Sequence, residues 1–410
     1  MNKAAETPWQ NDQWFVSPWN YAPQAVAGWE FPETIKVHDL TLRDGEQQAG
    51  LCLRKEDKVR IAESMAEMGV QRIEAGIPVV SDEDFAAIVE IVKRNLGPDI
   101  FALARCRVAD VQRVVDTGVK HAIVEIPCSE HMLEHAYRWP LQKAIDLSVE
   151  ATRYAHEQGL YVVFFPIDST RTEMNWYLDL IQQVAEYGHM DALALVDTAG
   201  VLSPHAIPYL VKATRERIQQ PLEAHFHNDF GLGVANTIAA LASGVSVAHL
   251  TSMGIGERAG NTPLEETVLA LRLLYGQDLG IKMENFRQHS LLVRELTGVV
   301  QPPNRPVVGD TLFTMEAGII TDWYRNVGDD HFLEVFPFVP ELVGQEKESI
   351  ILGKKSGAAS IDAWLEKMEV DADAEERQEI LTRVKVRGVQ LKGPLSELDF
   401  RAIVDEVVNS

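Results

Sequence analysis

Cysteine is scarce in this 410-residue chain, which has only Cys52, Cys106 and Cys128. Their spacing fits neither a metal-binding nor a redox motif, so we interpret them as reduced packing residues rather than catalytic thiols. No run reaches the roughly 18 consecutive apolar residues that a membrane helix needs. The N-terminus also lacks the apolar core of a signal peptide. We therefore expect a cytoplasmic protein that does not enter a membrane.

Positively charged residues are also few, because the chain has 38 Lys and Arg residues against 61 Asp and Glu residues. Its net charge is −23. Such a chain repels nucleic acid and anionic membrane surfaces, so neither is expected as a partner. Anionic small substrates are not excluded, since one bound cation and one arginine can invert the local potential. The hydrophobic content of 46% is enough for a large core.

The chain from residue 35 alternates short apolar runs with longer stretches whose apolar residues recur at helical spacing. The runs are 35–40, 72–77, 100–105, 122–126, 161–166, 192–197, 222–227 and 247–252, and the last helix spans 263–275. Regular alternation of this kind predicts a parallel sheet. Eight units over roughly 240 residues suit an α/β fold, the (β/α)8 TIM barrel. An open doubly wound sheet is disfavoured, because no Gly-rich dinucleotide fingerprint follows the first run.

Four regions are predicted along the chain. Residues 1–33, which carry Trp9, Trp14, Trp19 and Trp29, form an N-terminal extension that packs on the barrel or on a partner subunit. Residues 34–295 form the barrel. A Pro-rich linker and a first subdomain occupy 296–345, and a helical second subdomain occupies 346–410.

Two histidines and one aspartate stand where a barrel places its chemistry, at the carboxyl ends of the strands. Arg43 and Asp44 follow the first run, and the seventh run ends in His225-Phe226-His227. Both imidazoles point into the barrel mouth because side chains in a strand alternate with a period of two. Two imidazoles and a carboxylate predict a site for a divalent metal, Mg, Mn, Co or Zn, with open positions for substrate. Arg43 would add a fixed positive charge beside it.

Three other polar residues end or follow the runs. Glu74 could serve as a catalytic acid or base, or could orient Arg43. Thr198 could hold a substrate carboxylate or merely cap a turn. Asn261 could complete the metal shell or cap the last barrel helix.

Together these residues resemble a known family, the DRE-TIM metallolyases, in its Claisen-condensing branch of 2-isopropylmalate, homocitrate and citramalate synthases. The matching segments are DLTLRDGEQQAG (39–50), RIEAGIP (72–78), LVDTAG (195–200), AHFHNDFGLGVANT (224–237) and GIGERAGNTPLEE (254–266). The similarity continues into VVGDTLFTMEAGI and LGKKSG beyond the barrel.

The resemblance implies a homodimeric acyltransferase that condenses an acyl-CoA, usually acetyl-CoA, with a 2-oxo acid. Asp44, His225 and His227 match the family's metal ligands, and Asn261 matches a residue at or beside that shell. It further implies that Arg43 stabilises the carbonyl oxygen, that Thr198 binds the substrate carboxylate and that Gln47 is another polar site residue. We also expect no C-terminal regulatory domain, since the resemblance ends with the second subdomain.

The chain departs from the family where the acyl-CoA is deprotonated. Ile167 replaces the glutamate of a motif that reads roughly PEDxxR, and Ile320 replaces the histidine of EAGIH. Met315 stands in place of a preceding histidine, and His331 falls on a family tyrosine. The usual catalytic histidine is therefore altered, and His331 or Tyr324 becomes the candidate base.

Four hypotheses about the function follow from this sequence. The first is a synthase with a changed base, and the second is a lyase that runs the same chemistry in reverse. Against the lyase, GIGERAGN has no thiol, whereas the corresponding loop of the hydroxymethylglutaryl-CoA lyases contains a cysteine. The third is condensation with a donor other than a CoA thioester, and the fourth is a non-catalytic relative.

Overall fold

The computed structural model describes residues 7–408, which divide into two compact units. Residues 20–300 form one unit, here named the barrel unit. Residues 7–19 and 301–408 form the other, here named the C-terminal unit. The N-terminal region expected at 1–33 is thus divided between the two units, and residues 1–6 lie outside the described part.

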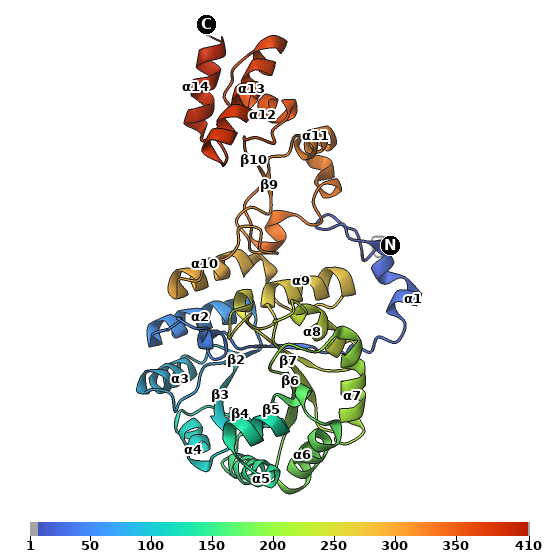
Figure 1. The fold of residues 1–410 in the computed structure, drawn as a ribbon, viewed down its shortest axis with the longest axis vertical. Coiled ribbons are helices and arrows are strands. Elements are labelled where there is room, and N and C mark those ends of the chain that lie inside the picture. The colour runs from blue at the N-terminus through green and yellow to red at the C-terminus, as the bar shows by residue number, and fades with distance from the viewer. Residues whose placement is uncertain (1–6, 409–410) are drawn as a thin grey trace. The chain divides into compact units, whose positions relative to one another are not determined.

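The barrel unit is built on a closed barrel of eight parallel strands, each hydrogen-bonded to the next and β8 to β1 (Figure 1). The strands are β1 (Lys36–Asp39), β2 (Arg72–Glu74), β3 (Asp99–Arg105), β4 (His121–Pro127), β5 (Tyr161–Ile167), β6 (Ala192–Asp197), β7 (Leu222–Phe226) and β8 (Val247–Leu250). The predicted (β/α)8 barrel is confirmed, and every strand lies on or within a residue or two of a predicted apolar run.

Helices surround this barrel, as Figure 1 shows for the ribbon around the central strands. They are α2 (Lys55–Met68), α3 (Asp82–Arg94), α4 (Val108–Asp116), α5 (Leu141–Glu157), α6 (Met174–Tyr187), α7 (Ile207–Arg215), α8 (Gly233–Leu241) and α9 (Leu264–Tyr275), with α10 (Phe286–Thr297) after them and the short α1 (Pro23–Val26) before the barrel.

Helix α3 illustrates how the local sequence sets these elements. Ser81 caps its N-terminus by accepting a hydrogen bond from the backbone N–H of Asp84 at 3.0 Å. The buried face carries Ala87, Ile88 and Ile91, whose spacing places them on one side of the helix. Asn95 then ends it in the left-handed conformation, with φ of 50°.

Alternate residues of the strands fill the barrel interior. Phe101, Leu103, Ile123, Val163 and Phe165 belong to one buried apolar cluster. They occupy odd-numbered positions of β3, β4 and β5, so odd-numbered residues of these strands face inward. This alternation determines which side chains point into the barrel mouth.

The N-terminal segment contributes to both units. In the barrel unit the Tyr21 hydroxyl donates to the carbonyl of Leu273 at 2.7 Å, and the Trp29 ring lies 4.9 Å from that of Tyr275. In the C-terminal unit Trp14 forms a backbone bridge with Phe338.

The C-terminal unit is mainly helical, with a parallel pair of two-residue strands, β9 (Thr314–Met315) and β10 (Ser349–Ile350). Its helices are α11 (Gly318–Val327), α12 (Ala358–Lys367), α13 (Ala374–Leu391) and α14 (Glu397–Val408). Ile361, Leu365, Ile380, Val384 and Phe400 form the core of the last three helices.

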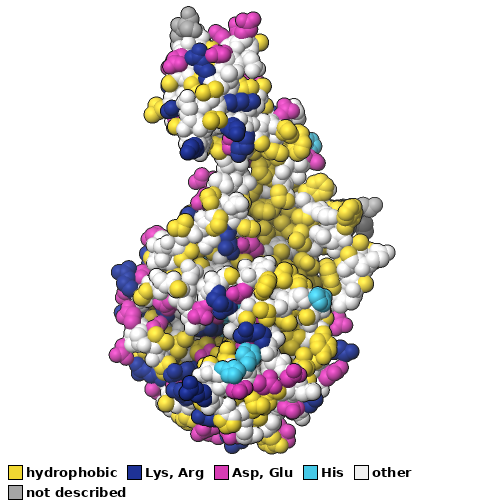
Figure 2. Space-filling view, in the orientation of Figure 1, with side chains coloured by type: hydrophobic (Ala, Val, Ile, Leu, Met, Phe, Trp, Pro, Cys, Tyr) yellow, Lys and Arg dark blue, Asp and Glu magenta, His cyan; other side chains and the backbone are white. Residues whose placement is uncertain are grey.

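The surface carries charges of both signs. On the face drawn in Figure 2, Lys and Arg side chains are interspersed with Asp and Glu over the barrel unit. Among residues 7–408, no helix combines the length and the apolarity that crossing a bilayer requires.

Candidate active site at the barrel mouth

Asp44, His225 and His227 converge at the carboxyl end of the barrel. Asp44 lies in a tight turn after β1, where the backbone N–H of Gly45 donates to the carbonyl of Leu40 at 3.0 Å. His225 lies on β7 and His227 one residue beyond it, so both face inward as the alternation predicts. All three are buried.

The spacing of these side chains fits a bound cation. Asp44 Oδ2 lies 3.4 Å from His225 Nε2 and 3.8 Å from His227 Nε2, and the two Nε2 atoms are 3.4 Å apart. Ligands about 2.1 Å from one ion at tetrahedral or octahedral angles lie roughly 3.0–3.4 Å apart. Little movement would therefore bring all three onto a divalent metal.

The protonation states also suit a metal. Burial lowers the pKa of His225 well below its ordinary value and lowers that of His227, so both imidazoles are neutral. Burial alone would raise the pKa of Asp44, but Arg43, His227 and a hydrogen bond from Asn261 hold it below its ordinary value.

Asn261 also keeps a buried Oδ1 atom that accepts no hydrogen bond, and its backbone pairs with that of His227. That oxygen is available to a cation.

Arg43 is fixed beside this cluster by Glu74, the last residue of β2. Its Nε donates to Glu74 Oε1 at 2.8 Å and its Nη2 to Oε2 at 3.2 Å. Its Nη1 donates to Asp44 Oδ2 at 3.0 Å and to Gln47 Oε1 at 3.3 Å. One N–H on Nη2 is left for a substrate oxygen, since guanidinium carries five donors.

Thr198 lies across the mouth, after β6. Its Oγ1 accepts the backbone N–H of Asp168 at 2.9 Å, which leaves the hydroxyl hydrogen free to donate. Asp168 is buried, has a left-handed φ of 63° and accepts from Arg171 Nε at 2.6 Å. Asp168 and Arg171 are thus the retained parts of the motif in which Ile167 replaces the glutamate.

Lys58 of α2 contacts the turn that carries Arg43 and Gln47. Its buried Nζ donates to the carbonyl of Leu42 at 3.0 Å and pairs with Glu46 at 2.6 Å and Asp84 at 2.5 Å. It therefore ties the turn after β1 to the start of α3. Nothing in the sequence pattern around Lys58 marks it as part of the site.

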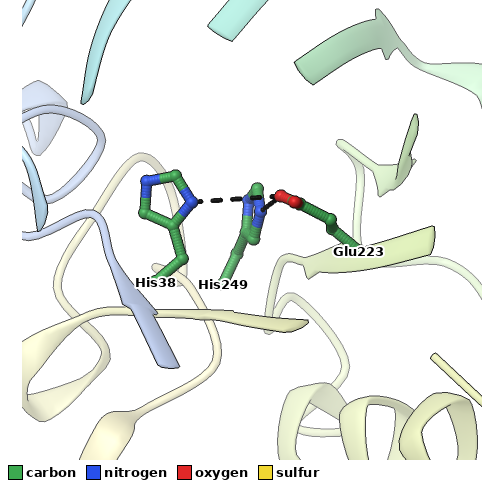
Figure 3. A group of neighbouring side chains, drawn as sticks. All are labelled: His38, Glu223 and His249. Atoms are coloured by element: carbon green, nitrogen blue, oxygen red, sulfur yellow. Dashed lines mark hydrogen bonds and ion pairs between the residues drawn. The ribbon is translucent and has the colours of Figure 1, made fainter. Parts of the chain in front are cut away.

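A second buried cluster lies deeper in the barrel, formed by His38, Glu223 and His249 (Figure 3). Glu223 Oε2 lies 2.7 Å from His249 Nε2 and 3.9 Å from His38 Nδ1. Arg72 Nη1 donates to the other oxygen of Glu223 at 2.7 Å. Burial alone would raise the pKa of Glu223, but the hydrogen bond from His249 and the charge of Arg72 hold it well below its ordinary value. We interpret this cluster as an ion-pair network, because the guanidinium already neutralises the carboxylate and 2.7 Å is a hydrogen-bond distance.

Glu125 is a further acidic residue at the mouth and is not among the residues predicted from the sequence. It follows Ile123 by two positions on β4, so its side chain faces inward. Burial raises its pKa to about 7, with Arg43 lowering it and Glu74 and Asp44 raising it. Its position as the single charged residue in the run AIVEI was the available signal.

The predicted residues Tyr324 and His331 belong to the C-terminal unit. The Tyr324 hydroxyl donates to Glu348 Oε1 at 2.6 Å, and His331 is exposed in a short 3-10 helix. The other eight predicted site residues, Arg43, Asp44, Gln47, Glu74, Thr198, His225, His227 and Asn261, all lie in the barrel unit.

Comparison with known proteins identifies the family. A family model described as HMGL-like matches residues 34–293, more than half of the 410-residue chain. The chain belongs to the HMGL-like family. The predicted kinship with the DRE-TIM synthases is confirmed by relatives that are more than 30% identical over most of the chain.

Three relatives illustrate this similarity. Homocitrate synthase AksA of Methanothermobacter thermautotrophicus is 35% identical, over 95% of this chain and 97% of its own. Putative (R)-citramalate synthase CimA of Archaeoglobus fulgidus is 39% identical, over 91% of this chain and 75% of its own. A probable 2-isopropylmalate synthase of Ignicoccus hospitalis is 38% identical, over 92% and 93%.

Solved structures agree on the fold. The HMG-CoA lyase of Bacillus subtilis superposes with a TM-score of 0.60 at 20% identity, covering 67% of this chain and 97% of its own. At that identity the likeness extends to the barrel and not to the reaction.

Proposed function

We propose that this HMGL-like protein is an acyltransferase that condenses an acyl-CoA, acetyl-CoA by preference, with a 2-oxo acid and releases CoA. The observation that carries the proposal is the joint placement of Asp44, His225 and His227 with Arg43 at one barrel mouth. Relatives named as homocitrate, citramalate and 2-isopropylmalate synthases support it.

The proposed metal ligands are Asp44, His225 and His227, with Asn261 at or beside the shell. A divalent cation held there, Mg, Mn, Co or Zn, would supply positive charge that polarises the keto group of a 2-oxo acid. The carboxylate and the two neutral imidazoles leave positions open for the substrate.

The chain's own residues then bind and orient the substrate. The remaining N–H of Arg43 donates a hydrogen bond to the keto oxygen. This hydrogen bond strengthens as the oxygen gains negative charge. The Thr198 hydroxyl donates to the substrate carboxylate, and Gln47 steadies Arg43 from the other side. Glu74 is assigned to orienting Arg43, because both of its oxygens accept from the guanidinium.

The reaction forms one carbon–carbon bond. A base removes a proton from the acetyl methyl group, and the resulting carbanion attacks C2 of the 2-oxo acid. The keto oxygen takes up a proton and becomes a hydroxyl group. Water then cleaves the thioester, which yields a carboxylate and the free thiol of CoA.

His331 or Tyr324 of the C-terminal unit is proposed as the base, since Ile320 carries no ionisable group. The proposal includes a cytoplasmic homodimer, and a solution mass of twice the chain mass would test the oligomeric state.

A free-thiol assay with metal-loaded protein, acetyl-CoA and a panel of 2-oxo acids tests the function. We expect thiol release that requires one class of 2-oxo acid and stops when EDTA removes the cation. Cleavage of a 3-hydroxy acid to a 2-oxo acid, without thiol release on any acceptor, would instead favour the lyase. Release without a 2-oxo acid would contradict both.

A further inference from the structure

Glu125 is an ionisable side chain of the barrel unit to which the proposed mechanism gives no role. Within residues 7–408 no hydrogen bond or ion pair joins its carboxylate to another group, although the residue is half-buried. A carboxylate that is partly removed from water costs free energy unless another group satisfies it. A bound ligand is therefore the natural partner for this group.

The register of the sheet places Glu125 at the level of the active site. Glu125 pairs with Phe165 of β5. The Phe165 ring lies 4.8 Å from that of His225 and 5.7 Å from the Arg43 guanidinium carbon. Residues paired in this way on adjacent parallel strands point to the same face, so Glu125 faces the space in front of His225 and Arg43.

The opposite neighbour of Glu125 does not neutralise it. Arg105 of β3 is its register partner, but its guanidinium is turned to Asp110 of α4. Ile77, Leu103 and Ile167 belong to or pack against the apolar cluster of this side of the barrel. The Glu125 carboxylate is thus surrounded by apolar side chains on the side of the mouth formed by β3, β4 and β5.

The orientation of the 2-oxo acid determines what meets this side of the mouth. Its keto oxygen lies with Arg43 and the histidines, at β1 and β7, and its carboxylate with Thr198, at β6. The side chain on C2 must then extend across the mouth toward β3–β5. Glu125 is the polar group that it meets there.

We propose that Glu125 selects the 2-oxo acid, favouring acceptors whose side chain carries a hydrogen-bond donor, a hydroxyl or ammonium group, over apolar or acidic ones. The inference rests on the proposed function and specifies its substrate class. The raised pKa of Glu125 fits a carboxyl that lacks its partner until such a substrate binds. A second carboxylate on the acceptor would meet a like charge.

The test compares two acceptors of equal shape, 4-hydroxy-2-oxobutanoate and 2-oxopentanoate, which differ by a hydroxyl in place of a methyl group. With metal-loaded enzyme and acetyl-CoA, we expect kcat/KM to favour the hydroxyl compound by about 10- to 100-fold. Glu125→Leu should abolish or reverse that ratio, and Glu125→Gln, which keeps a hydrogen-bond acceptor, should retain part of it. Glu134→Leu, at an exposed glutamate, should leave the ratio unchanged.

Several results would overturn the proposal. A wild-type preference for 2-oxopentanoate or 2-oxoglutarate would do so. So would an equal loss of turnover on every acceptor in Glu125→Gln, which would mark a proton-transfer group rather than a selector.

A failure of the proposed function would look different, because no acceptor would then release CoA. In that case the same two compounds are compared as ligands, by the rise in Tm that each gives to the metal-loaded protein. The proposal predicts a larger rise with the hydroxyl compound in wild type but not in Glu125→Leu. Equal rises would refute it.

Discussion

The Arg43 guanidinium is held against both carboxylate oxygens of Glu74, at 2.8 Å from Nε and 3.2 Å from Nη2. Both side chains are buried, so the pair is shielded from the solvent that weakens surface ion pairs. This contact aims the remaining N–H of Arg43 into the mouth.

Glu74→Gln should therefore lower kcat by about 100-fold, because a reacting group displaced by an ångström loses catalytic alignment. Metal content should be unaffected, since Glu74 is not among the proposed ligands. Steady-state kinetics beside metal analysis would check both. A kcat equal to that of wild type would contradict the positioning role.

His227→Ala should remove one metal ligand. We expect nearly complete loss of bound metal and a fall in kcat/KM of about 1000-fold or more, with the far-UV spectrum unchanged because other side chains pack the core. The exposed His205→Ala is the matched control. Full metal content in His227→Ala would rule out the ligand assignment.

Lys58→Met should destabilise the protein by about 3–5 kcal/mol, because it leaves Glu46 and Asp84 without their shared cation in a buried site. Lys55→Met, at a partly exposed lysine one turn earlier, should change the free energy of unfolding by no more than about 0.5 kcal/mol. Urea unfolding of both variants measures the difference. Equal stabilities for the two would refute the role given to Lys58.

Glu125 should also make stability depend on pH. Its folded pKa of about 7 lies above the ordinary value of 4.5, so between these values the folded state keeps a proton that the unfolded state has lost. Stability from this group is present below pH 4.5 and is lost as pH rises to 7. The charges that act on it are those of Arg43, Glu74, Asp44 and Arg105.

The Tm of Glu125→Gln relative to wild type should therefore rise between pH 5 and pH 8, measured with EDTA present so that no cation contributes. Glu134→Gln should show no such trend. A difference that stays constant with pH would show that the Glu125 pKa is ordinary.

His331→Ala should lower kcat more than it raises KM if His331 is the acid or base of the reaction. Tyr324→Phe makes the same test of the other candidate, whose hydroxyl donates to Glu348. His135→Ala, at an exposed histidine, is the control. A pH–rate profile unchanged by either variant would exclude that residue.

The barrel was predictable because each strand corresponds to a short apolar run that lies between stretches of helical periodicity. The ends of those runs mark the carboxyl ends of the strands, where the mouth lies. The convergence of Asp44, His225 and His227 was predictable too, because the ends of barrel strands meet at one mouth and strand alternation turns both histidines inward. The orienting role of Glu74 was left open in the sequence, because only the fold brings β1 and β2 side chains into contact.

Other features depend on contacts that the sequence does not encode locally. Lys58 lies in the charged helical stretch KEDKVR and looks like a surface lysine until Leu42, Glu46 and Asp84 surround it. The position of Glu125 beside the site follows only from its register with Phe165. The environment of His38 likewise depends on Glu223, which lies 185 positions later on β7. The pairing of Trp14 with Phe338 likewise joins two segments 324 positions apart.

The most direct test of the account follows the acetyl carbons. Metal-loaded protein is given acetyl-CoA labelled with ¹³C in both acetyl carbons together with the acceptor found active, and the product is read by NMR and mass spectrometry. We predict a hydroxy diacid that carries both labelled carbons, as a new CH2–COO⁻ group on the former C2 of the acceptor, formed in equal amount with free CoA. Label that remains in acetyl-CoA, or that appears only as free acetate, would contradict the condensation.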